Sequence, residues 1–450
     1  MPGRVPVHNA KVSRVSHLSP TRHSLLGKWV FLPLAATLFS SVPGISIAQS
    51  DAERIKELER KLDQSLKTIE GLSKRLKEVE SRAPARPQPA PAAPQLQEHH
   101  ERQVPAFGDE LPPPPTVLRG FADVGANFSG NGGKKGFFDG SVDFYLTPQL
   151  SSNIKSVMEL VFEHDKATGE LAPDLERLQV GYTFSNATTL WLGRFHTPFG
   201  YWNTAFHHGQ QLQTSVLRPQ MIDFEDNGGV IPAHTVGVWG TGAVRTGNGR
   251  FAYDVFLGNS PSISGTVPGS AAGTLNPNNL GKTEPGYSTG FNLGYLPGGT
   301  ADGLKIGVHG YRAVVRDDSA PLNITRVNIL GGYAALDSPA WEIIAEYYAL
   351  RNQDLSGGTG SHASWTGFVQ MGRRLERWTP YVRVERAALD QADNYFAALA
   401  TGRAYSRQAL GLRYDLTSNT ALKTELNHTV SEAMPTVIFN QLLTQWSIRF

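Results

Sequence analysis

Residues 197–234 read TPFGYWNTAFHHGQQLQTSVLRPQMIDFEDNGGVIPAH and interrupt two short segments of alternating apolar and polar residues. The stretch is too long and too polar for a tight turn, and it mixes aromatic, charged and amide side chains with glycines and prolines. Loops of this length inside an ordered domain are usually functional or disordered. We expect an ordered loop around which the C-terminal two-thirds of the chain is built.

The residues on both sides of this loop alternate with a period of two, as strands with one apolar face do. In LERLQVGYTF (175–184), for example, Leu178, Val180 and Tyr182 share one face. The same pattern begins at Leu118 and predicts sixteen strands. They are expected near 118–128, 137–147, 152–164, 175–184, 188–196, 235–246, 250–259, 287–297, 303–315, 324–336, 340–351, 362–375, 377–387, 403–416, 419–430 and 437–450.

The links between these strands fall into two classes of length. Links after even-numbered strands are short, such as SNA (185–187) and GNG (247–249), whereas those after odd-numbered strands are longer on the whole. A soluble β-sandwich has no reason to segregate its loops in this way, but an outer-membrane barrel has one rim of short turns and one of long loops. The sequence predicts an all-β, 16-stranded antiparallel transmembrane β-barrel over residues 118–450.

Aromatic residues give an independent test of this interpretation. Six of them fall at the short-turn ends of strands and on the apolar face, as an interfacial girdle requires. They are Phe184, Tyr295, Trp341, Trp378, Tyr414 and Phe450.

The residues before the barrel form three further segments. Residues 1–48 have a basic start, an apolar core and small residues at Ser46 and Ala48, which is typical of a cleaved export signal. A membrane anchor is the alternative, but the apolar core is short for a spanning helix. Residues 83–117 contain ten prolines and predict an extended linker.

Residues 49–82 carry a heptad pattern. Apolar residues recur at seven-residue intervals from Ile55 and, except for Ser65, from Leu58, while most other positions are charged or small. Four heptads predict a short α-helical coiled coil. The pattern leaves a dimer or a trimer open, and a single solvated helix is the alternative.

Charge and composition exclude several functions. The leader carries five of the 42 basic residues and none of the 40 acidic residues, so the remainder of the chain is slightly acidic. Nucleic acid is therefore not an expected partner. With no cysteine, the chain has neither disulfides nor a thiol nucleophile or thiol metal ligand. No cofactor is predicted.

The chemistry available to such a barrel lies at its constriction and on its inner wall, where charged and polar side chains set the selectivity of a channel. The predicted constriction residues are Arg194, His196, Trp202, His207, His208, Arg218, Asp223, Glu225 and Asp226. The predicted wall residues are Arg383, Arg407, Arg413, Glu342 and Glu346, with Arg119, Lys155, Lys423 and Glu425 also facing inward. The bases are denser on the thirteenth and fourteenth strands, which predicts a transverse field. The alternative is that these charges solvate the interior and pair with one another.

Two other chemistries are weaker interpretations of the same loop. His207 and His208 with nearby acids suggest a metal site, but no known ligand spacing is present. Ser215 and His207 suggest a hydrolase, but such a pair is too common in sequences to indicate an enzyme.

The segments FDGSVDFYLTPQLSSNIKSVMELVFE (138–163) and LGRFHTPFG (192–200) resemble the phosphate-selective porin O and P superfamily. The order of leader, coiled coil, linker and barrel is similar to that of its trimeric dicarboxylate-associated porins. The resemblance implies a homotrimer whose third outer loop folds into the lumen. The arginine ladder and lysine cluster expected of a phosphate channel are not obvious in this sequence.

These observations together lead to a functional expectation. The protein is expected to be a passive diffusion channel for small polar or anionic solutes in the bacterial outer membrane, in contact with lipid and with its coiled coil in the periplasm. The terminal Phe450 resembles the signal read by the barrel-assembly machinery. A structural barrel that reaches peptidoglycan through the coiled coil is the alternative function.

Overall fold

A computed structural model describes residues 117–130, 135–164, 170–185, 187–206, 209–265, 272–278, 286–320, 322–432 and 436–450, and four positions nearer the N-terminus. The chain divides into two units, residues 1–102 and 103–450. In the first unit Lys56, Arg60, Lys67 and Lys74 are helical and exposed. The heptad seam, the leader and nearly all of the linker lie outside the described residues, so those assignments stay predictions.

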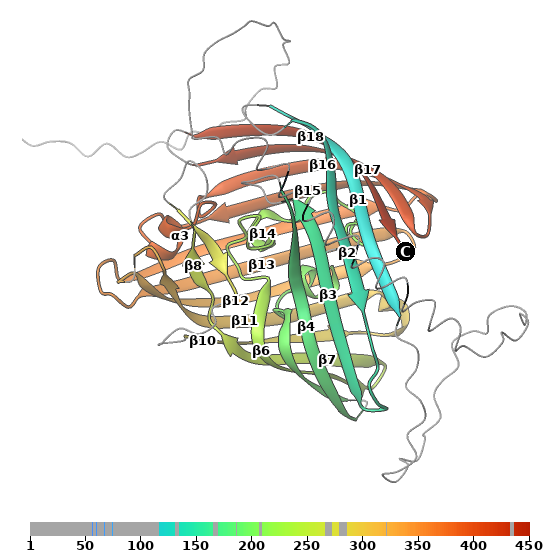
Figure 1. The fold of residues 1–450 in the computed structure, drawn as a ribbon, viewed down its shortest axis with the longest axis horizontal. Coiled ribbons are helices and arrows are strands. Elements are labelled where there is room, and N and C mark those ends of the chain that lie inside the picture. The colour runs from blue at the N-terminus through green and yellow to red at the C-terminus, as the bar shows by residue number, and fades with distance from the viewer. Residues whose placement is uncertain are drawn as a thin grey trace, which may run out of the picture. The chain divides into compact units, whose positions relative to one another are not determined.

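The second unit is built almost entirely from strands (Figure 1). The strands of the wall are β1 (Leu118–Ser129), β2 (Lys135–Leu146), β3 (Ile154–His164), β4 (Leu171–Ser185), β5 (Thr188–His196), β6 (His234–Thr246), β7 (Gly249–Asn259), β10 (Tyr287–Leu296), β11 (Leu304–Asp317), β12 (Ile324–Asp337), β13 (Trp341–Asp354), β14 (Ser361–Arg373), β15 (Trp378–Ala388), β16 (Tyr405–Thr417), β17 (Thr420–Ser431) and β18 (Val437–Arg449).

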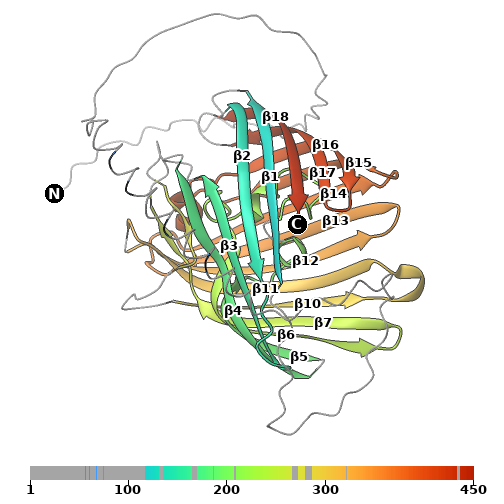
Figure 2. The same ribbon diagram turned by 45° about the vertical axis from the view of Figure 1, so that its right-hand side comes forward.

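These sixteen strands form a closed antiparallel barrel, which confirms the predicted fold class. Each strand pairs with its neighbours in sequence, β7 pairs with β10, and β18 returns to pair with β1. Phe450 completes the closure, because its backbone exchanges hydrogen bonds of 2.9 and 3.0 Å with Gly120. Figure 2 shows the strands passing around the barrel wall.

The strand bounds agree with the predicted ones to within a few residues, with one larger difference. β4 begins at Leu171 instead of 175 because its first residues pair with the end of β3, where Leu171 lies opposite His164. The link between β7 and β10 also contains two three-residue strands, β8 (Ser262–Ser264) and β9 (Thr274–Asn276), which pair with each other.

The two faces of the wall differ as the alternation predicts. On β13, Glu342, Glu346 and Tyr348 are buried, whereas Trp341 and Tyr347 are exposed. Five of the six girdle aromatics are exposed, and Tyr414 is half-buried with its ring 4.3 Å from that of Trp378. The apolar side chains of the wall therefore point outward, the reverse of a soluble barrel.

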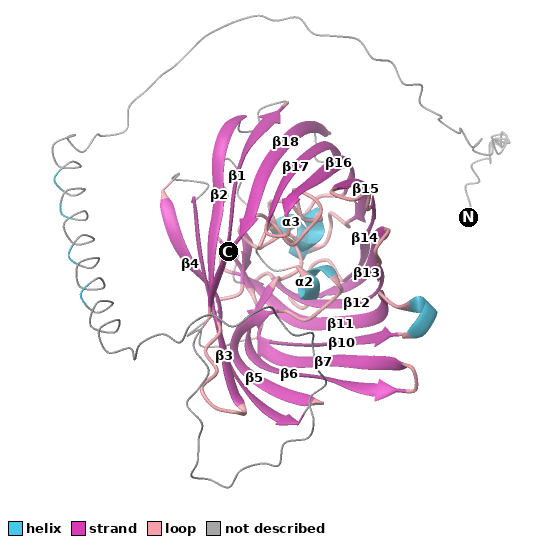
Figure 3. Cartoon of the chain, turned by 90° about the vertical axis from the view of Figure 1, so that its right-hand side faces the viewer, coloured by secondary structure: helices cyan, strands magenta, loops and turns pink. Residues whose placement is uncertain are grey.

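The buried apolar cluster lies where two long loops pack against the wall. The first loop, residues 197–233, contains α2 (Trp202–Ala205) and η1 (Gln220–Ile222). The second loop follows β15 and contains α3 (Asn394–Ala398). Both helices lie inside the ring of strands (Figure 3), and Trp202, Ile222 and Phe396 belong to the same buried cluster as wall residues.

The second inward loop was not predicted from the sequence. It contacts the first directly, since the Tyr395 hydroxyl donates to the carbonyl of Val230 at 2.7 Å. The Thr401 hydroxyl donates to the carbonyl of Gly228. The two loops thus form one inner layer.

No helix among the described residues is long and apolar enough to cross a bilayer.

Candidate constriction site

The 197–233 loop, here called the inner loop, enters the barrel at a sharp turn. Gly200 has φ of 64°, and a Cβ there would stand 2.3 Å from Oε2 of Glu346, so the turn requires glycine. The Glu346 carboxylate then accepts the backbone N–H groups of Tyr201 and Trp202 at 3.2 and 2.6 Å. It also accepts the Tyr348 hydroxyl at 2.5 Å. A wall carboxylate therefore satisfies the first donors of α2.

Further along the loop, three more wall carboxylates accept hydrogen bonds from it. Each comes from a different strand, in the range β13 to β17. Glu342 accepts the Thr214 hydroxyl at 2.7 Å, Glu425 accepts the Val216 N–H at 2.8 Å, and Glu385 accepts the Gln220 N–H at 2.9 Å. The loop has no regular ladder of its own here, so these bonds satisfy backbone groups that burial would otherwise leave unpaired.

Wall bases satisfy the loop carbonyls in the same region. Arg413 donates to Gln211 and Gln213 at 2.8 and 2.9 Å. Lys423 donates to the carbonyls of Ser215, at 3.2 Å, and Gln210.

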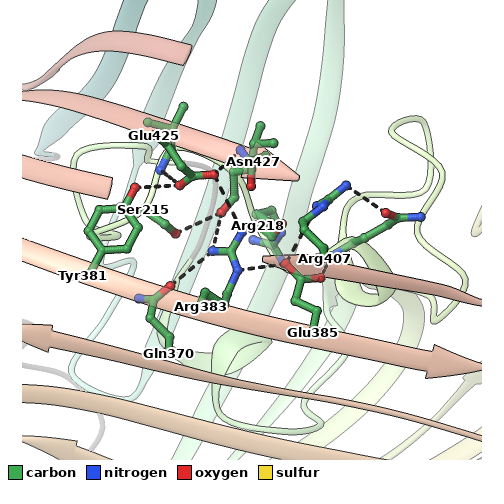
Figure 4. Close-up of polar contacts among 12 residues, drawn as sticks. Ser215, Arg218, Gln370, Tyr381, Arg383, Glu385, Arg407, Glu425 and Asn427 are labelled. Atoms are coloured by element: carbon green, nitrogen blue, oxygen red, sulfur yellow. Dashed lines mark hydrogen bonds and ion pairs between the residues drawn. The ribbon is translucent and has the colours of Figure 1, made fainter. Parts of the chain in front are cut away.

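Arg383 on β15 is the centre of this arrangement (Figure 4). Its side chain is fully buried and donates to Glu385 at 2.8 Å, to Gln370 at 3.1 Å and to the carbonyl of Leu217 at 2.9 Å. Glu425 lies 3.9 Å away and also accepts the Tyr381 hydroxyl at 2.6 Å. Two buried carboxylates thus share one guanidinium, a costly arrangement unless every partner is satisfied.

Arg407 on β16 lies at the edge of the same network. It donates to Gln220 Oε1 at 2.8 Å and stands 3.8 Å from Glu385.

Arg218 supports the inner loop from within. It donates to Asn203 at 3.1 Å and to the carbonyls of Phe206 and Ile222 at 3.2 and 3.0 Å, and its guanidinium lies 4.1 Å from the centroid of the Phe224 ring. Burial lowers the pKa of Arg218, and the acids Asp223 and Glu225 oppose that shift. The residue holds three separate turns of the loop together.

The end of the loop returns to the wall through a buried polar cluster. His234 stands between two carboxylates, with Nδ1 2.9 Å from Glu225 and Nε2 2.8 Å from Glu176. Arg194 forms an ion pair with Glu176 at 3.2 Å. His196 packs its ring 4.8 Å from that of His234. Arg194, His196 and Glu225 thus lie together at the root of the loop.

The remaining predicted constriction residues are found in different settings. Trp202 is fully buried, with its ring 5.7 Å from that of Phe368 on the wall. It therefore packs the inner loop against the wall and does not line an open passage. Asp226 is exposed and Asp223 is half-buried. His207 and His208 lie outside the described residues.

The sequence predicted a transverse electric field from the bases on β15 and β16, and the geometry of these side chains corrects that prediction. Arg383, Glu342 and Glu346 are buried, and Arg413 and Arg407 keep little exposure. Their charges are directed at loop backbone and at each other. Strand alternation located these side chains on the inner face, but it could not show that a loop covers them.

A second set of bases lies at the short-turn rim, where four are exposed and one is half-buried. Each shares the inward face of its strand and makes no ion pair within 4 Å in the part of the chain that the structure describes. The set, here called the rim bases, is Arg119, Lys155, Arg245, Arg250 and Lys305. The nearby acids Asp337 and Asp415 are paired with Arg374 and Arg413. The sequence analysis missed the last three rim bases, although the same alternation carried to the strand ends would find them.

No group of three or more His, Asp or Glu side chains suited to a metal ion occurs in the described ranges.

Comparison with solved structures shows the class of fold. An anion-selective porin from Comamonas acidovorans has a TM-score of 0.50 at 12% identity, covering 75% of this chain and 99% of that chain. The outer membrane channel DcaP of Acinetobacter baumannii gives 0.48 at 12% identity, covering 74% and 97%. No protein-family model and no curated protein matches the sequence. At such low identity the first likeness shows a porin fold, and the O and P superfamily stays a prediction.

Proposed function

We propose that this protein is a diffusion channel of the bacterial outer membrane for small polar solutes, with a preference for anions. The rim bases carry the preference. Five inward-facing cations stand around the short-turn mouth and make no ion pair within 4 Å in the described part of the chain, and the rim acids Asp337 and Asp415 are already paired with other arginines. A ring of one sign of charge attracts the opposite ion and raises its local concentration.

The inner loop supplies the narrowing in this proposal. It is held to β13–β17 by paired charges, and a sixteen-stranded barrel is wide enough for an aqueous passage beside such a loop. Lys305 lies close to the loop entrance, with its ammonium nitrogen 5.6 Å from the ring centroids of Tyr201 on the loop and Tyr333 on the wall.

The fold comparison agrees with this proposal, because the neighbour with the higher TM-score is described as anion-selective. The homotrimer, the periplasmic coiled coil and recognition of Phe450 by the barrel-assembly machinery are parts of the same proposal. They rest on the heptads of residues 49–82 and on the final strand. Contact of the coiled coil with peptidoglycan is proposed only as an accessory role.

The test is single-channel recording in planar bilayers under a salt gradient. The wild-type protein should open in steps and give a reversal potential of the sign for anion preference. The variant Arg245→Gln/Arg250→Gln/Lys305→Gln should lose most of that preference. Its conductance should stay within about threefold of the wild-type value, a change that corresponds to less than ~1 kcal/mol.

The control is Arg373→Gln/Arg386→Gln, which removes two arginines on outward-facing positions of β14 and β15. It should leave the reversal potential unchanged. A folded wild-type barrel without conductance would overturn the channel proposal. Cation preference in the wild type would refute the role of the rim bases and redirect attention to Asp223 and Asp226.

A further inference from the structure

Three arginines form a group on the outer face of the barrel, close to the rim with the long loops, and Arg316 of β11 lies nearer that rim. Arg312 on β11 and Arg351 on β13 are exposed, and Arg326 on β12 is half-buried. All three alternate with residues that point inward, such as Tyr311, Val327 and Leu350. We call this set the outer arginine cluster.

The cluster is compact because its three strands are neighbours. Arg312 lies opposite Asn328 in the register of β11 and β12. The Asn328 amide donates to the carbonyl of Arg351 at 2.9 Å, and Arg326 donates to Gln353 at 2.8 Å. Adjacent strands are ~4.8 Å apart, so the outer two arginines arise ~10 Å from each other. Three guanidinium groups can therefore meet around one polyatomic anion.

The outer arginine cluster has no acidic counterpart in the wall. The outward positions of β11, β12 and β13 hold no Asp or Glu at all. None of the three arginines forms an ion pair among the described residues. A lipid-facing arginine is costly in the hydrocarbon region and nearly neutral at the interface, so these positions require an anionic partner or the headgroup level.

Neighbouring aromatics place the cluster at that level. The exposed rings of Tyr347 and Trp365 stack with centroids 6.0 Å apart on β13 and β14. Tyr347 lies four residues before Arg351 on the same face of β13. Tyrosine and tryptophan favour the boundary between hydrocarbon and headgroups. The arginines lie beyond these rings, toward the long-loop rim.

An apolar groove begins at the cluster. It has a volume of about 790 Å³. Arg312 and Asn328 form its polar end, and Leu330, Phe291 and Leu257 line its length. The ring of Phe291 lies over Gly310, where a Cβ would stand 2.6 Å from Cε1 of that ring.

We infer that the outer arginine cluster binds the phosphate of a membrane lipid whose acyl chain lies in this groove. Arginine matches phosphate oxygens with paired N–H donors, and the groove supplies the apolar surface for a chain. Charge complementarity selects a phosphate-bearing lipid, because the outward face around the arginines has no carboxylate to repel it. The inference rests on the proposed function only in assuming that this wall faces a membrane.

The test is native mass spectrometry of the full-length protein released from detergent micelles. The probes are dipalmitoyl phosphatidate and dipalmitoyl phosphatidylcholine, which share their chains and differ in headgroup. The wild type should retain phosphatidate in preference to phosphatidylcholine. Arg312→Gln/Arg326→Gln/Arg351→Gln should reduce retained phosphatidate about tenfold, which corresponds to ~1.4 kcal/mol.

The matched control is Arg119→Gln/Arg245→Gln/Arg250→Gln, with the same charge change on the inward face. It should retain phosphatidate as the wild type does. Equal loss in both variants, or no loss in either, would overturn the inference. Displacement of the lipid by millimolar inorganic phosphate would also overturn it, by showing a site for the free anion. A changed subunit number in the outer variant would reassign the face to an interface between copies.

A single substitution keeps the test independent of folding problems in the triple variant. Arg351→Lys retains the charge and loses the paired donors, so its phosphatidate retention should fall between the wild type and the triple variant. Conductance of the outer variants should stay at the wild-type level. Loss of conductance in the wild type would therefore remove the channel proposal without deciding the lipid site.

Discussion

The carboxylate of Glu346 on β13 accepts the backbone N–H of Trp202 at 2.6 Å. A residue of the wall thus binds the first turn of α2, although the two bonded residues are 144 positions apart in the chain. This bond is the first of a series in which wall charges satisfy loop backbone. The loop is consequently part of the barrel's polar interior.

Glu346→Gln tests this relationship. The carboxylate accepts three donors, and an amide turns an N–H group toward them, so ~1–3 kcal/mol of stability should be lost. We expect a lower temperature for the heat-modifiable mobility shift and noisier channel currents. Glu432→Gln, at an exposed carboxylate, is the matched control. Unchanged currents and mobility in Glu346→Gln would show that the loop does not depend on this bond.

Arg383 provides a second test of the inner loop. Arg383→Met leaves Glu385 and Glu425 buried without their shared cation, and removing one partner of a buried ionic group costs about 3–5 kcal/mol. We expect fewer folded barrels and larger, irregular conductance in those that assemble. Arg383→Lys should restore little, because lysine lacks the planar fork that reaches Gln370, Glu385 and Leu217 together.

Arg386→Met is the control for this change, since Arg386 lies on the same strand with its side chain exposed. If both Arg383 variants behaved as Arg386→Met does, the role assigned to Arg383 would be contradicted.

The anion preference should weaken as salt is raised. The rim bases act through water, and the Debye length falls from about 10 Å at 0.1 M salt to ~3 Å at 1 M. The reversal potential measured at a constant concentration ratio should therefore approach zero at high salt. A preference that does not change with ionic strength would point to dehydrated sites in the constriction.

The second inward loop should respond to acid. His362 stands 2.8 Å from Asp390, and this hydrogen bond lowers the pKa of the Asp390 carboxyl below its ordinary value. A lowered folded-state pKa means that the contact is fully stabilising above the ordinary aspartate pKa. It is lost as the pH falls through the lower folded value.

Asp390→Asn should therefore increase proteolytic cleavage within residues 389–404 at neutral pH. The variant and the wild type should converge below the folded pKa of Asp390. A difference that persists at the most acidic pH would show that another interaction of Asp390 is responsible.

Removal of Phe450 separates assembly from stability. The terminal residue is half exposed, with 52% of its surface accessible, and it pairs with Gly120 across the closure. Deletion should reduce the amount of assembled barrel in cells strongly, while refolding from denaturant into detergent should remain efficient. Equal loss in both settings would mean that Phe450 closes the barrel instead of serving as an assembly signal.

The sequence by itself determined the wall. Strand alternation has a period of two, so residues such as Glu346 and Arg383 could be assigned to the inner face from their neighbours alone. Link lengths fixed the even strand number and distinguished the two rims. These properties are local, because each strand is recognised from its own residues and each short turn from the few between two strands.

Only the tertiary structure decided what the inner face does. The alternation stops at Thr197, and within the inner loop no periodicity tells which side chains meet water. Arg218 and Trp202 are polar or amphipathic residues of a polar loop, and the sequence placed them at the constriction. Their burial follows from partners far away in the chain, such as Phe368 for Trp202. Pairing across such separations depends on barrel closure, which brings β13–β17 beneath the loop.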